Sequence, residues 1–212
     1  MNAPIIAPEG YPHIAVTVFL AGLAHWLAGP WWAIPFYLVV IFVLQFFRDP
    51  PRRIPSEPLG VVSPADGKVV FVGPAEDPYL HRPSVKISVF MNVFDVHSNR
   101  SPVEGKVTNR WYQAGRFLNA VLDKASAENE RNALWIRTDE GDDVVCVQVA
   151  GLVARRILCY VNAGDRVGQG QRYGFIRFGS RLDVYLPPGV RVHATLGTRV
   201  SAGSDIIAHL VH

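Results

Sequence analysis

The sequence predicts a mainly β protein of the α+β class, with a sandwich-like or barrel-like body, one short helix and an N-terminal hydrophobic helical hairpin. Three observations support this prediction. Residues 1–47 carry a single charged side chain, Glu9, and no Lys or Arg. Beyond them, short apolar runs of strand length alternate with turns rich in Gly, Pro and Asp. Within this second part of the chain, only residues 116–128 have the spacing of a helix, with Phe117, Val121 and Leu122 on one face.

The composition divides the chain into a membrane-anchoring segment, residues 1–47, and a β-rich domain, residues 48–212. All 21 Lys and Arg residues lie from Arg48 onward, so the net charge of +3 separates into −1 for the first part and +4 for the second. A mildly basic body beside an apolar segment suits an anionic membrane surface. Nucleic acid is a poor fit, because the chain has no dense Lys/Arg run and no basic patch interleaved with aromatic residues.

The apolar segment has two halves. Residues 14–29 and 31–47 are apolar apart from three polar side chains, and Pro30 lies between them. Halves of 16 and 17 residues are short for a membrane span, which needs about 20. The Gly29–Pro30 junction therefore predicts a helical hairpin or a re-entrant anchor. One long broken helix and the buried hairpin of a soluble protein are the alternatives.

Three arginines follow this segment, namely Arg48, Arg52 and Arg53. Positively charged residues beside a membrane segment favour the cytoplasmic side. We therefore expect the segment in the cell (inner) membrane and the body on its cytoplasmic side. A cleaved signal peptide is disfavoured, because residues 1–12 have no positively charged n-region.

The body consists of short predicted strands. In chain order they are residues 61–62, 68–73, 85–93, 103–113, 133–138, 144–149, 152–161 and 181–186. A turn that contains Gly141 joins two of them as a hairpin. The short spacing favours a sandwich or a closed barrel.

The two cysteines, Cys146 and Cys159, lie in apolar, strand-like runs. They form no C-x-x-C pair and no spacing with His that is typical of zinc sites, so we expect no metal site. We interpret both as reduced core thiols of a protein in a cytosolic setting.

The last predicted strand follows a Gly179–Ser180 pair. Within it Leu182, Val184 and Leu186 alternate with Arg181, Asp183 and Tyr185, the period of a half-buried strand. A serine hydroxyl after such a glycine can attack the preceding carbonyl group. β-Elimination of the resulting ester then breaks the chain and leaves dehydroalanine, which water hydrolyses, with loss of ammonia, to a pyruvoyl ketone. Such a ketone forms a Schiff base with an amine substrate and accepts electrons from it. Taken alone, the pair also suits an ordinary strand start, and it lacks the G-x-S-x-G elbow of a hydrolase.

Five motifs occur in a specific order. They are F-F-R-D-P-P-R-R-I-P at 46–55, S-P-A-D-G-K-V at 63–69, F-M-N-V-F-D-V-H-S-N-R-S-P at 90–102, N-E-R-N at 129–132 and F-G-S-R-L-D-V-Y-L-P at 178–187. Over residues 36–193 this set resembles the phosphatidylserine decarboxylase family in its short bacterial or archaeal form. The resemblance implies a self-processing, pyruvoyl-dependent decarboxylase that converts phosphatidylserine to phosphatidylethanolamine and CO2 at the membrane.

The same resemblance implies roles for individual residues. Ser180 is the expected precursor of the covalent pyruvoyl (pyruvate) cofactor, and Gly179 the expected end of the large chain after cleavage. The large and small chains are expected to remain associated. Asp66 matches the family's acidic residue in self-cleavage, and His97 matches its essential histidine. Together they form a Ser–His–Asp set in which His97 is the base and Asp66 orients it.

One motif departs from part of the family. Some members carry two histidines three residues apart, whereas the second position here is Arg100. A single imidazole, that of His97, would then serve both self-cleavage and the later proton transfer, so the division of labour stays open. Asp95 is an alternative to Asp66 as the carboxylate partner of this histidine.

Further residues are candidates for binding the lipid. Arg100, Arg116 and Arg131 are candidates for the phosphodiester, although a structural or solvated arginine is the alternative in each case. Phe117, on the predicted helix, is a candidate to dip toward the acyl chains, with core packing as the alternative.

Residues 162–176 contain a G-D-x-V-x-x-G-Q pattern similar to the hairpin turn of biotinyl and lipoyl carrier domains. This similarity supports one alternative function, an uncleaved, membrane-tethered, carrier-like binding module. A carrier needs a modifiable Lys, and none stands between Gly164 and Gly179. The other alternative is a pyruvoyl decarboxylase of a different amine substrate, although a soluble substrate needs no anchor. The sequence leaves the oligomeric state, including a homo-oligomer, open.

Overall fold

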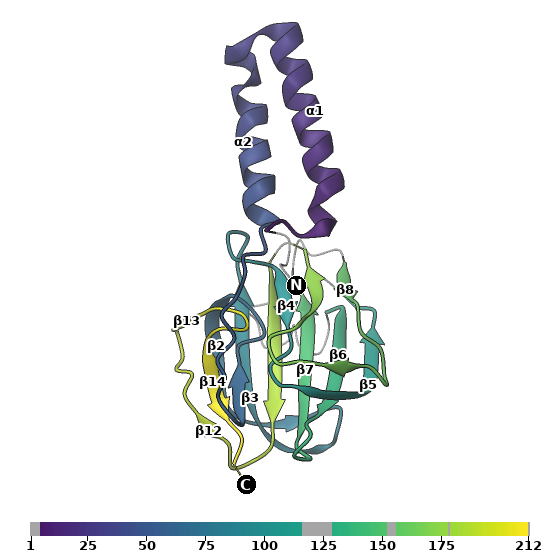
Figure 1. Ribbon diagram of the computed structural model, residues 1–212, viewed down its shortest axis with the longest axis vertical. Helices are drawn as coiled ribbons and strands as arrows, with labels where there is room; N and C mark the ends of the chain where they lie inside the picture. Colours follow the sequence, from purple (N-terminus) through teal and green to yellow (C-terminus); the bar gives the residue numbers. More distant parts are fainter. Residues whose placement is uncertain (1–4, 116–128, 152–155, 178, 212) are drawn as a thin grey trace. The chain divides into compact units, whose positions relative to one another are not determined.

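Two units make up the chain, Met1–Pro51 and Arg52–His212. The computed structural model describes residues 5–115, 129–151, 156–177 and 179–211 (Figure 1). The helix predicted at 116–128 lies outside the described residues, as does the first part of the strand predicted at 152–161.

The first unit is a helical hairpin, as the Gly29–Pro30 junction predicts. It consists of a 3₁₀ turn at Pro8–Gly10, helix α1 at Tyr11–Ala28 and helix α2 at Pro30–Phe46. The two helices lie side by side and run antiparallel (Figure 1). Gly29 ends α1, where its N–H donates to the carbonyl of His25 at 3.0 Å. Pro30 begins α2, at a position that needs no N–H donor.

The hairpin presents apolar side chains on all sides. Trp26, Trp31 and Trp32 are 79%, 82% and 74% exposed. A helix that is hydrophobic all round belongs either in a large core or in a membrane. The segment Pro8–Ala28, with 21 residues, is long and apolar enough to cross a membrane, whereas α2 is shorter. This unit therefore has the surface of a membrane tether.

Three polar side chains within the hairpin are hydrogen-bonded to each other or to the backbone. The Tyr37 hydroxyl lies 2.8 Å from Nδ1 of His25, and the Thr17 hydroxyl donates to the carbonyl of His13 at 2.9 Å. Such internal pairing is what an apolar environment demands, because lipid offers no partner.

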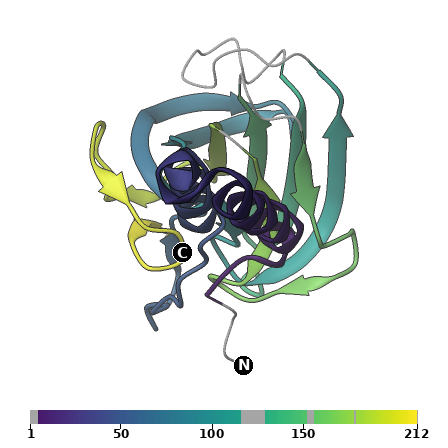
Figure 2. The same ribbon diagram turned by 90° about the horizontal axis from the view of Figure 1, so that it is seen from above.

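An eight-stranded antiparallel sheet is the framework of the second unit. Its strands lie in the order β13-β2-β3-β11-β7-β6-β5-β9. In that order their bounds are Arg199–Val200, Gly67–Asp77, Arg82–Met91, Ser180–Leu186, Asp143–Ala150, Arg131–Arg137, Gly105–Gln113 and Arg166–Val167. The sheet curls like an open barrel when seen from above (Figure 2). This shape confirms the predicted mainly β, barrel-like body.

Two three-stranded sheets complete the second unit. One has the order β1-β14-β12, with bounds Gly60–Val62, Ile206–His209 and Arg191–Val192. The other has the order β4-β10-β8, with bounds Ser98–Arg100, Arg172–Ile176 and Ile157–Cys159. All three sheets contribute to one buried apolar core, which includes Ile87, Leu134, Tyr173, Val184 and Ile207.

The glycine-rich stretch 162–176 does not form a paired hairpin. Strand β9 pairs with β5, whereas β10 pairs with β4 and β8. The intervening turn is held from outside, because Gly170 N–H donates to Ser101 O and Ser101 N–H donates to Gln171 O, each at 2.8 Å. The carrier-like hairpin expected here is therefore corrected: its two strands enter different sheets because residue 101 takes up the hydrogen-bonding groups of the turn.

Strand β11 lies at the centre of the large sheet and is buried on both faces. The core face of β11 comprises Ser180, Leu182, Val184 and Leu186. The outer face comprises Arg181, Asp183 and Tyr185. All seven residues are buried, which corrects the half-buried strand expected from their alternation. The outer face is covered because a second apolar cluster, including Val147 and Trp111, packs on this side of the sheet.

The charges on the outer face are paired. Asp183 Oδ1 lies 2.8 Å from Arg181 Nε, and Asp183 Oδ2 lies 3.4 Å from Lys86 Nζ. Lys86 also lies over the ring of Tyr185, 5.6 Å from its centroid. Burial, followed by the negative charge of Asp183, raises the pKa of Tyr185 well above its usual value. This pairing permits charged groups to be buried in the middle of a sheet.

Candidate active site

Ser180 opens β11 and is fully buried. Its Oγ has no hydrogen-bond partner among the described residues. Gly179 before it has a φ of 61°, a left-handed conformation that costs other residues about 1–2 kcal/mol. A buried hydroxyl without a partner costs about 1–3 kcal/mol of folding free energy. This position therefore has a reason other than stability to carry a serine.

His97 directly precedes β4 and is fully buried as well. Its Nδ1 lies 2.9 Å from the backbone oxygen of Asp95. Because a carbonyl oxygen only accepts hydrogen bonds, we assign the ring hydrogen to Nδ1. In the neutral ring the lone pair then belongs to Nε2, so this is the nitrogen with the capacity to accept a proton.

Two connections place the segment around His97 at the end of the core where β11 begins. The backbone oxygen of His97 accepts the N–H of Ile176 at 3.3 Å, and Ile176 lies four residues before Ser180. Across the sheet, Met91 is the residue directly opposite Ser180, and the side-chain amide of Asn99 reaches its sulfur at 3.9 Å. A base and a buried hydroxyl thus share one end of the body, the arrangement that nucleophile activation requires.

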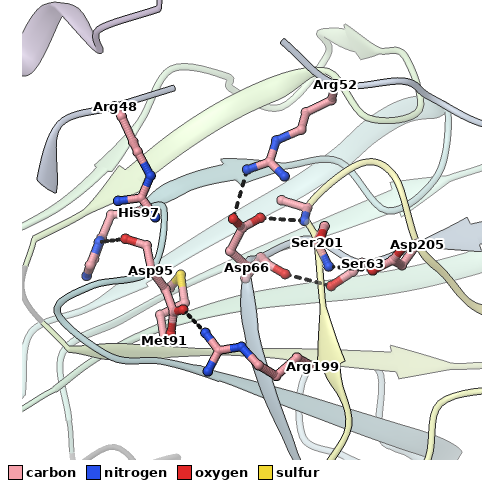
Figure 3. A network of polar contacts seen from close by, with 12 residues as sticks. Arg48, Arg52, Ser63, Asp66, Met91, Asp95, His97, Arg199, Ser201 and Asp205 are labelled. Carbon is pink, nitrogen blue, oxygen red and sulfur yellow. Dashed lines mark hydrogen bonds and ion pairs between the residues drawn. The ribbon is translucent and has the colours of Figure 1, made fainter. Parts of the chain in front are cut away.

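The carboxylate of Asp66 joins two distant segments (Figure 3). Its Oδ2 accepts from Arg52 Nη2 at 2.8 Å, and its Oδ1 accepts the N–H of Ala202 at 2.7 Å. Arg52 begins the second unit, whereas Ala202 lies beyond the Gly179–Ser180 bond. Asp66 therefore links the parts of the chain on either side of that bond.

Asp95 contacts His97 through its backbone carbonyl, and its carboxylate has other partners (Figure 3). Oδ2 accepts the N–H of Asn92 at 2.9 Å, and Oδ1 is paired with the guanidinium of Arg199. Burial raises the pKa of Asp95, and the Asn92 hydrogen bond and the Arg199 charge oppose that rise. The carboxylate thus stabilises the turn whose carbonyl orients the imidazole.

Sequence reasoning missed two members of this network. Arg199 lies 104 residues from Asp95 along the chain, and no local pattern marks it as a partner. The sequence marks Arg52 only as part of a basic cluster beside the apolar segment. Its place within the F-F-R-D-P-P-R-R-I-P motif is the one signal that could have identified it as a site residue.

Arg131 lies on the other side of the sheet from Ser180. In the β6–β7 and β7–β11 pairs, Arg131 is opposite Val149, and Val149 is opposite Arg181. Residues directly opposite each other share a face, and Ser180 and Arg181 alternate between faces. The register therefore places this candidate for the phosphodiester on the outer face, among Tyr79, Trp111 and Gln113.

The remaining weak candidates are placed as follows. Arg100 is buried in β4, where its Nη1 donates to the carbonyl of Gly170 at 3.2 Å. This contact anchors the turn between β9 and β10. Arg116 and Phe117 lie outside the described residues.

The two thiols lie on β7 and β8. Cys146 is buried with its Sγ 3.2 Å from the Tyr173 hydroxyl, and burial raises its pKa to about 12. Cys159 is partly buried, so the expected pair of core thiols holds fully only for Cys146. Within the ranges that the structure describes, no group of three or more His, Cys, Asp or Glu is arranged to hold a metal ion.

The chain is similar to proteins of one family over nearly its whole length. A family model described as phosphatidylserine decarboxylase matches residues 39–208. A phosphatidylserine decarboxylase proenzyme of Aromatoleum aromaticum is 64% identical over 207 residues, which cover 98% of this chain and 96% of the relative. Proenzymes of the same name from Nitrosomonas europaea and Burkholderia pseudomallei are 59% and 60% identical, over 97% and 98% of this chain and 95% and 96% of the relatives.

Proposed function

Because the chain belongs to the phosphatidylserine decarboxylase family, we propose that its precursor cleaves itself between Gly179 and Ser180 and carries a pyruvoyl group derived from Ser180. The reaction is the loss of the carboxyl group of phosphatidylserine as CO2, which leaves phosphatidylethanolamine. One observation carries the proposal. The Ser180 hydroxyl is buried, has no hydrogen-bond partner in the described part of the chain and directly follows a left-handed glycine.

Self-cleavage needs only atoms of the chain and one water molecule. Ser180 Oγ attacks the carbonyl carbon of Gly179, so that an ester replaces the peptide bond and the serine nitrogen becomes an amine. Loss of the Cα hydrogen of Ser180 then breaks its Cβ–Oγ bond, which releases Gly179 as a carboxylate and leaves dehydroalanine. Water hydrolyses the imine tautomer, ammonia departs, and the new N-terminus is a ketone.

His97 is the base that this sequence of steps requires. Its Nδ1 is held by the carbonyl of Asp95, so Nε2 is the nitrogen that can accept a proton. Positioned general bases contribute about 10²–10⁴-fold to a rate. Asp95 and Arg199 act indirectly in this proposal, because they stabilise the turn that orients the ring.

The surroundings of Ser180 fit a ketone made from that residue. Its two cross-strand neighbours, Met91 and Ala150, are apolar and buried, and none of the described residues competes for its oxygen. When present, the pyruvoyl ketone supplies an electron sink for an amine-bearing substrate. The chain itself contributes an end of the core that excludes water, together with His97 as a proton donor and acceptor.

The sheet explains how the two chains stay together after cleavage. The small chain would begin with β11, which is hydrogen-bonded on one side to β3 and on the other to β7. It also supplies β13 to β2 and β14 to β1. The contacts of Asp66 with Ala202 and of Asp95 with Arg199 join the two chains as well.

We assign the first unit as the anchor in the cell (inner) membrane, with the second unit on the cytoplasmic side. The exposed tryptophans of the hairpin and the arginines at 48, 52 and 53 support this assignment. The substrate is a membrane lipid, so a tether raises the effective concentration of the enzyme where the substrate lies.

Intact-mass analysis of the purified protein tests the proposal. We expect a large chain that ends at Gly179 and a 33-residue small chain that begins with a pyruvoyl group. The Ser180→Ala variant, prepared in the same way, should stay whole. A single chain near 23.5 kDa in active, unaltered protein would instead favour the uncleaved binding module.

The substrate is tested separately. Release of CO2 should be measured with phosphatidylserine in detergent micelles and, in the same preparation, with free serine. Turnover of the lipid alone supports the proposed substrate, whereas equal turnover of both would assign the pyruvoyl chemistry to a different amine substrate.

A further inference from the structure

Four polar side chains form a hydrogen-bond chain on the core side of the large sheet. Arg110 Nε donates to Asn132 Oδ1 at 2.8 Å, and Asn132 Nδ2 donates to Gln148 Oε1 at 2.9 Å. Gln148 Nε2 in turn donates to Asn99 Oδ1 at 2.7 Å. The three amides are fully buried, whereas Arg110 is partly exposed. We refer to Arg110, Asn132, Gln148 and Asn99 together as the amide chain.

The amide chain ends beside Ser180. Asn99 Nδ2 lies 3.4 Å from the backbone oxygen of His97 and 3.9 Å from the sulfur of Met91. Met91 is the residue directly opposite Ser180. On β7, Ser180 pairs with Ala150. Gln148 lies two residues before Ala150, a distance of about 7 Å along the strand.

Two groups, one that only donates and one that only accepts hydrogen bonds, determine which way each side-chain amide turns its C=O and its NH2 group. A guanidinium only donates, so Asn132 must turn its oxygen toward Arg110 and its NH2 group toward Gln148. The carbonyl of Leu158 only accepts, and it lies 3.2 Å from Gln148 Nε2, which orients Gln148 in the same sense. Asn99 therefore accepts at its oxygen and directs its N–H groups toward the backbone oxygen of His97 and the sulfur of Met91.

The fold leaves room for the amide chain at Gly174. A Cβ atom at this position would lie 2.6 Å from Gln148 Nε2 and 2.6 Å from the carbonyl oxygen of Leu158. Gly174 pairs with Asn99 between β10 and β4. A side chain here would displace the amide group that donates to Asn99, so the close approach requires glycine.

We propose that the amide chain is a positioning device for the reaction at Ser180. Arg110 sets the direction of Asn132, Asn132 and the Leu158 carbonyl together set the direction of Gln148, and Asn99 thereby holds His97 and Met91 in place around the reacting residue. The proposal rests on the role of His97 under the proposed function. Its members are positioning residues, which act through His97 and Met91. The amide chain controls the position of the reacting groups, and a shift of about 1 Å at a reacting group can lower the rate by about 10²-fold.

Variants of Arg110 test the proposal at its exposed end. Arg110→Met keeps the length of the side chain and removes the donor, whereas Arg110→Lys keeps a cationic donor. We expect Arg110→Met to slow self-cleavage and to lower kcat about tenfold, with KM for phosphatidylserine unchanged. Arg110→Lys should stay within about twofold of the unaltered protein, because its ammonium still sets the direction. Arg166→Met is the matched control, since Arg166 pairs with Asp139 at the surface.

Asn132→Asp tests the proposal inside the core. A carboxylate at this position still accepts from Arg110 but no longer donates to Gln148, so the direction is lost while a buried ion pair forms. We expect the same loss of about tenfold in cleavage rate and kcat, together with a lower midpoint of thermal unfolding, because the buried Gln148 carbonyl loses its donor. Asn109→Asp, on the same strand as Arg110 and outside the amide chain, is the control.

Cleavage is followed by intact mass on precursor made by cell-free synthesis, and turnover by CO2 release from mixed micelles. Slow Arg110→Met and Asn132→Asp variants beside a near-normal Arg110→Lys support the proposal. It is overturned if those two variants cleave and turn over within twofold of the unaltered protein, or if Arg110→Lys is as slow as Arg110→Met. An unaltered precursor that stays whole contradicts the proposed function instead, so the two failures are distinguishable.

Discussion

The two faces of β11 are equally buried and chemically opposite. The outer face places two charged side chains inside the protein, and its carboxylate, Asp183, lies 2.8 Å from Arg181 and 3.4 Å from Lys86. The core face places one hydroxyl, that of Ser180, among apolar neighbours, with no partner among the described residues. Differences in solvent access do not explain the contrast, since every residue of the strand is at most 5% exposed.

This difference between the two faces of β11 separates the groups that stabilise the strand from the hydroxyl that we propose to react. Buried charges are retained where they are paired, because an unpaired one costs several kcal/mol. A buried hydroxyl that forms no hydrogen bond destabilises the fold by about 1–3 kcal/mol and remains available as a nucleophile. One short strand therefore holds the sheet together through its outer face and presents on its core face the hydroxyl that we propose to react.

The largest effect is expected from Ser180→Ala. This variant removes the nucleophile, so self-cleavage should be abolished and intact mass should show one chain. Since the hydroxyl has no described partner, the free energy of unfolding should not fall. A precursor destabilised by more than about 1 kcal/mol in urea denaturation would show that the serine has a structural role, and the contrast between the faces would fail.

His97→Gln is expected to have the next largest effect. Glutamine keeps a polar side chain of similar reach and lacks a basic nitrogen, so self-cleavage should slow about 10²–10⁴-fold. Intact mass against time on freshly synthesised precursor measures the rate. Exposed His81→Gln is the control and should cleave normally. Rapid cleavage of His97→Gln would remove this residue from maturation.

On the outer face, Asp183→Ala should reduce stability and leave the chemistry intact. Removal of the carboxylate leaves the buried Arg181 and the partly buried Lys86 without it, which typically costs about 3–5 kcal/mol. Urea denaturation should be measured in the uncleavable Ser180→Ala background. The control, Asp139→Ala, breaks an exposed pair with Arg166 and should change the midpoint little. A variant that folds stably but fails to cleave would link the two faces and refute their separation.

The smallest effect concerns alkaline pH. Burial raises the pKa of Tyr185, so the folded chain keeps the phenol proton at a pH where the unfolded chain loses it, above about 10. The unfolded state then binds fewer protons, and stability falls as the pH rises past 10. Tyr185→Phe should lessen this fall, as measured by urea midpoints between pH 8 and 11. An unchanged slope would show that the tyrosine is not held protonated by the outer face.

Local patterns were sufficient for much of the fold. The charge-free segment with Gly29–Pro30 at its centre predicted the helical hairpin, and alternation predicted the strand at 181–186 and which of its residues share a face. Burial of the outer face was not predictable. It depends on Trp111 and Val147, which reach β11 only through the pairing of strands far apart in the sequence.

The candidate site shows the same limit. Motifs predicted Ser180, His97 and Asp66 as site residues, with Asp95 as the alternative carboxylate, and the structure assigns different contacts to the two carboxylates. Asp66 binds Arg52 and Ala202, whereas Asp95 orients His97 through its backbone. Its residue type made Arg131 a candidate for the phosphodiester, and the strand register places it on the face opposite Ser180. The residue type alone does not show on which face of the sheet a charged side chain lies.

Features that depend on residues close together in the sequence could be predicted from it. They are the turns, the strand period, the apolar hairpin and the Gly–Ser bond with its potential to react. Features that depend on register could not be predicted in this way. The partner of Asp95 lies 104 residues away, and that of Gln148 lies 49 residues away. A shift of one residue in strand pairing would exchange the faces of β11 and separate every one of these contacts. Only the folded sheet determines which residues come into contact, because the strand register depends on burying one whole face of the sheet.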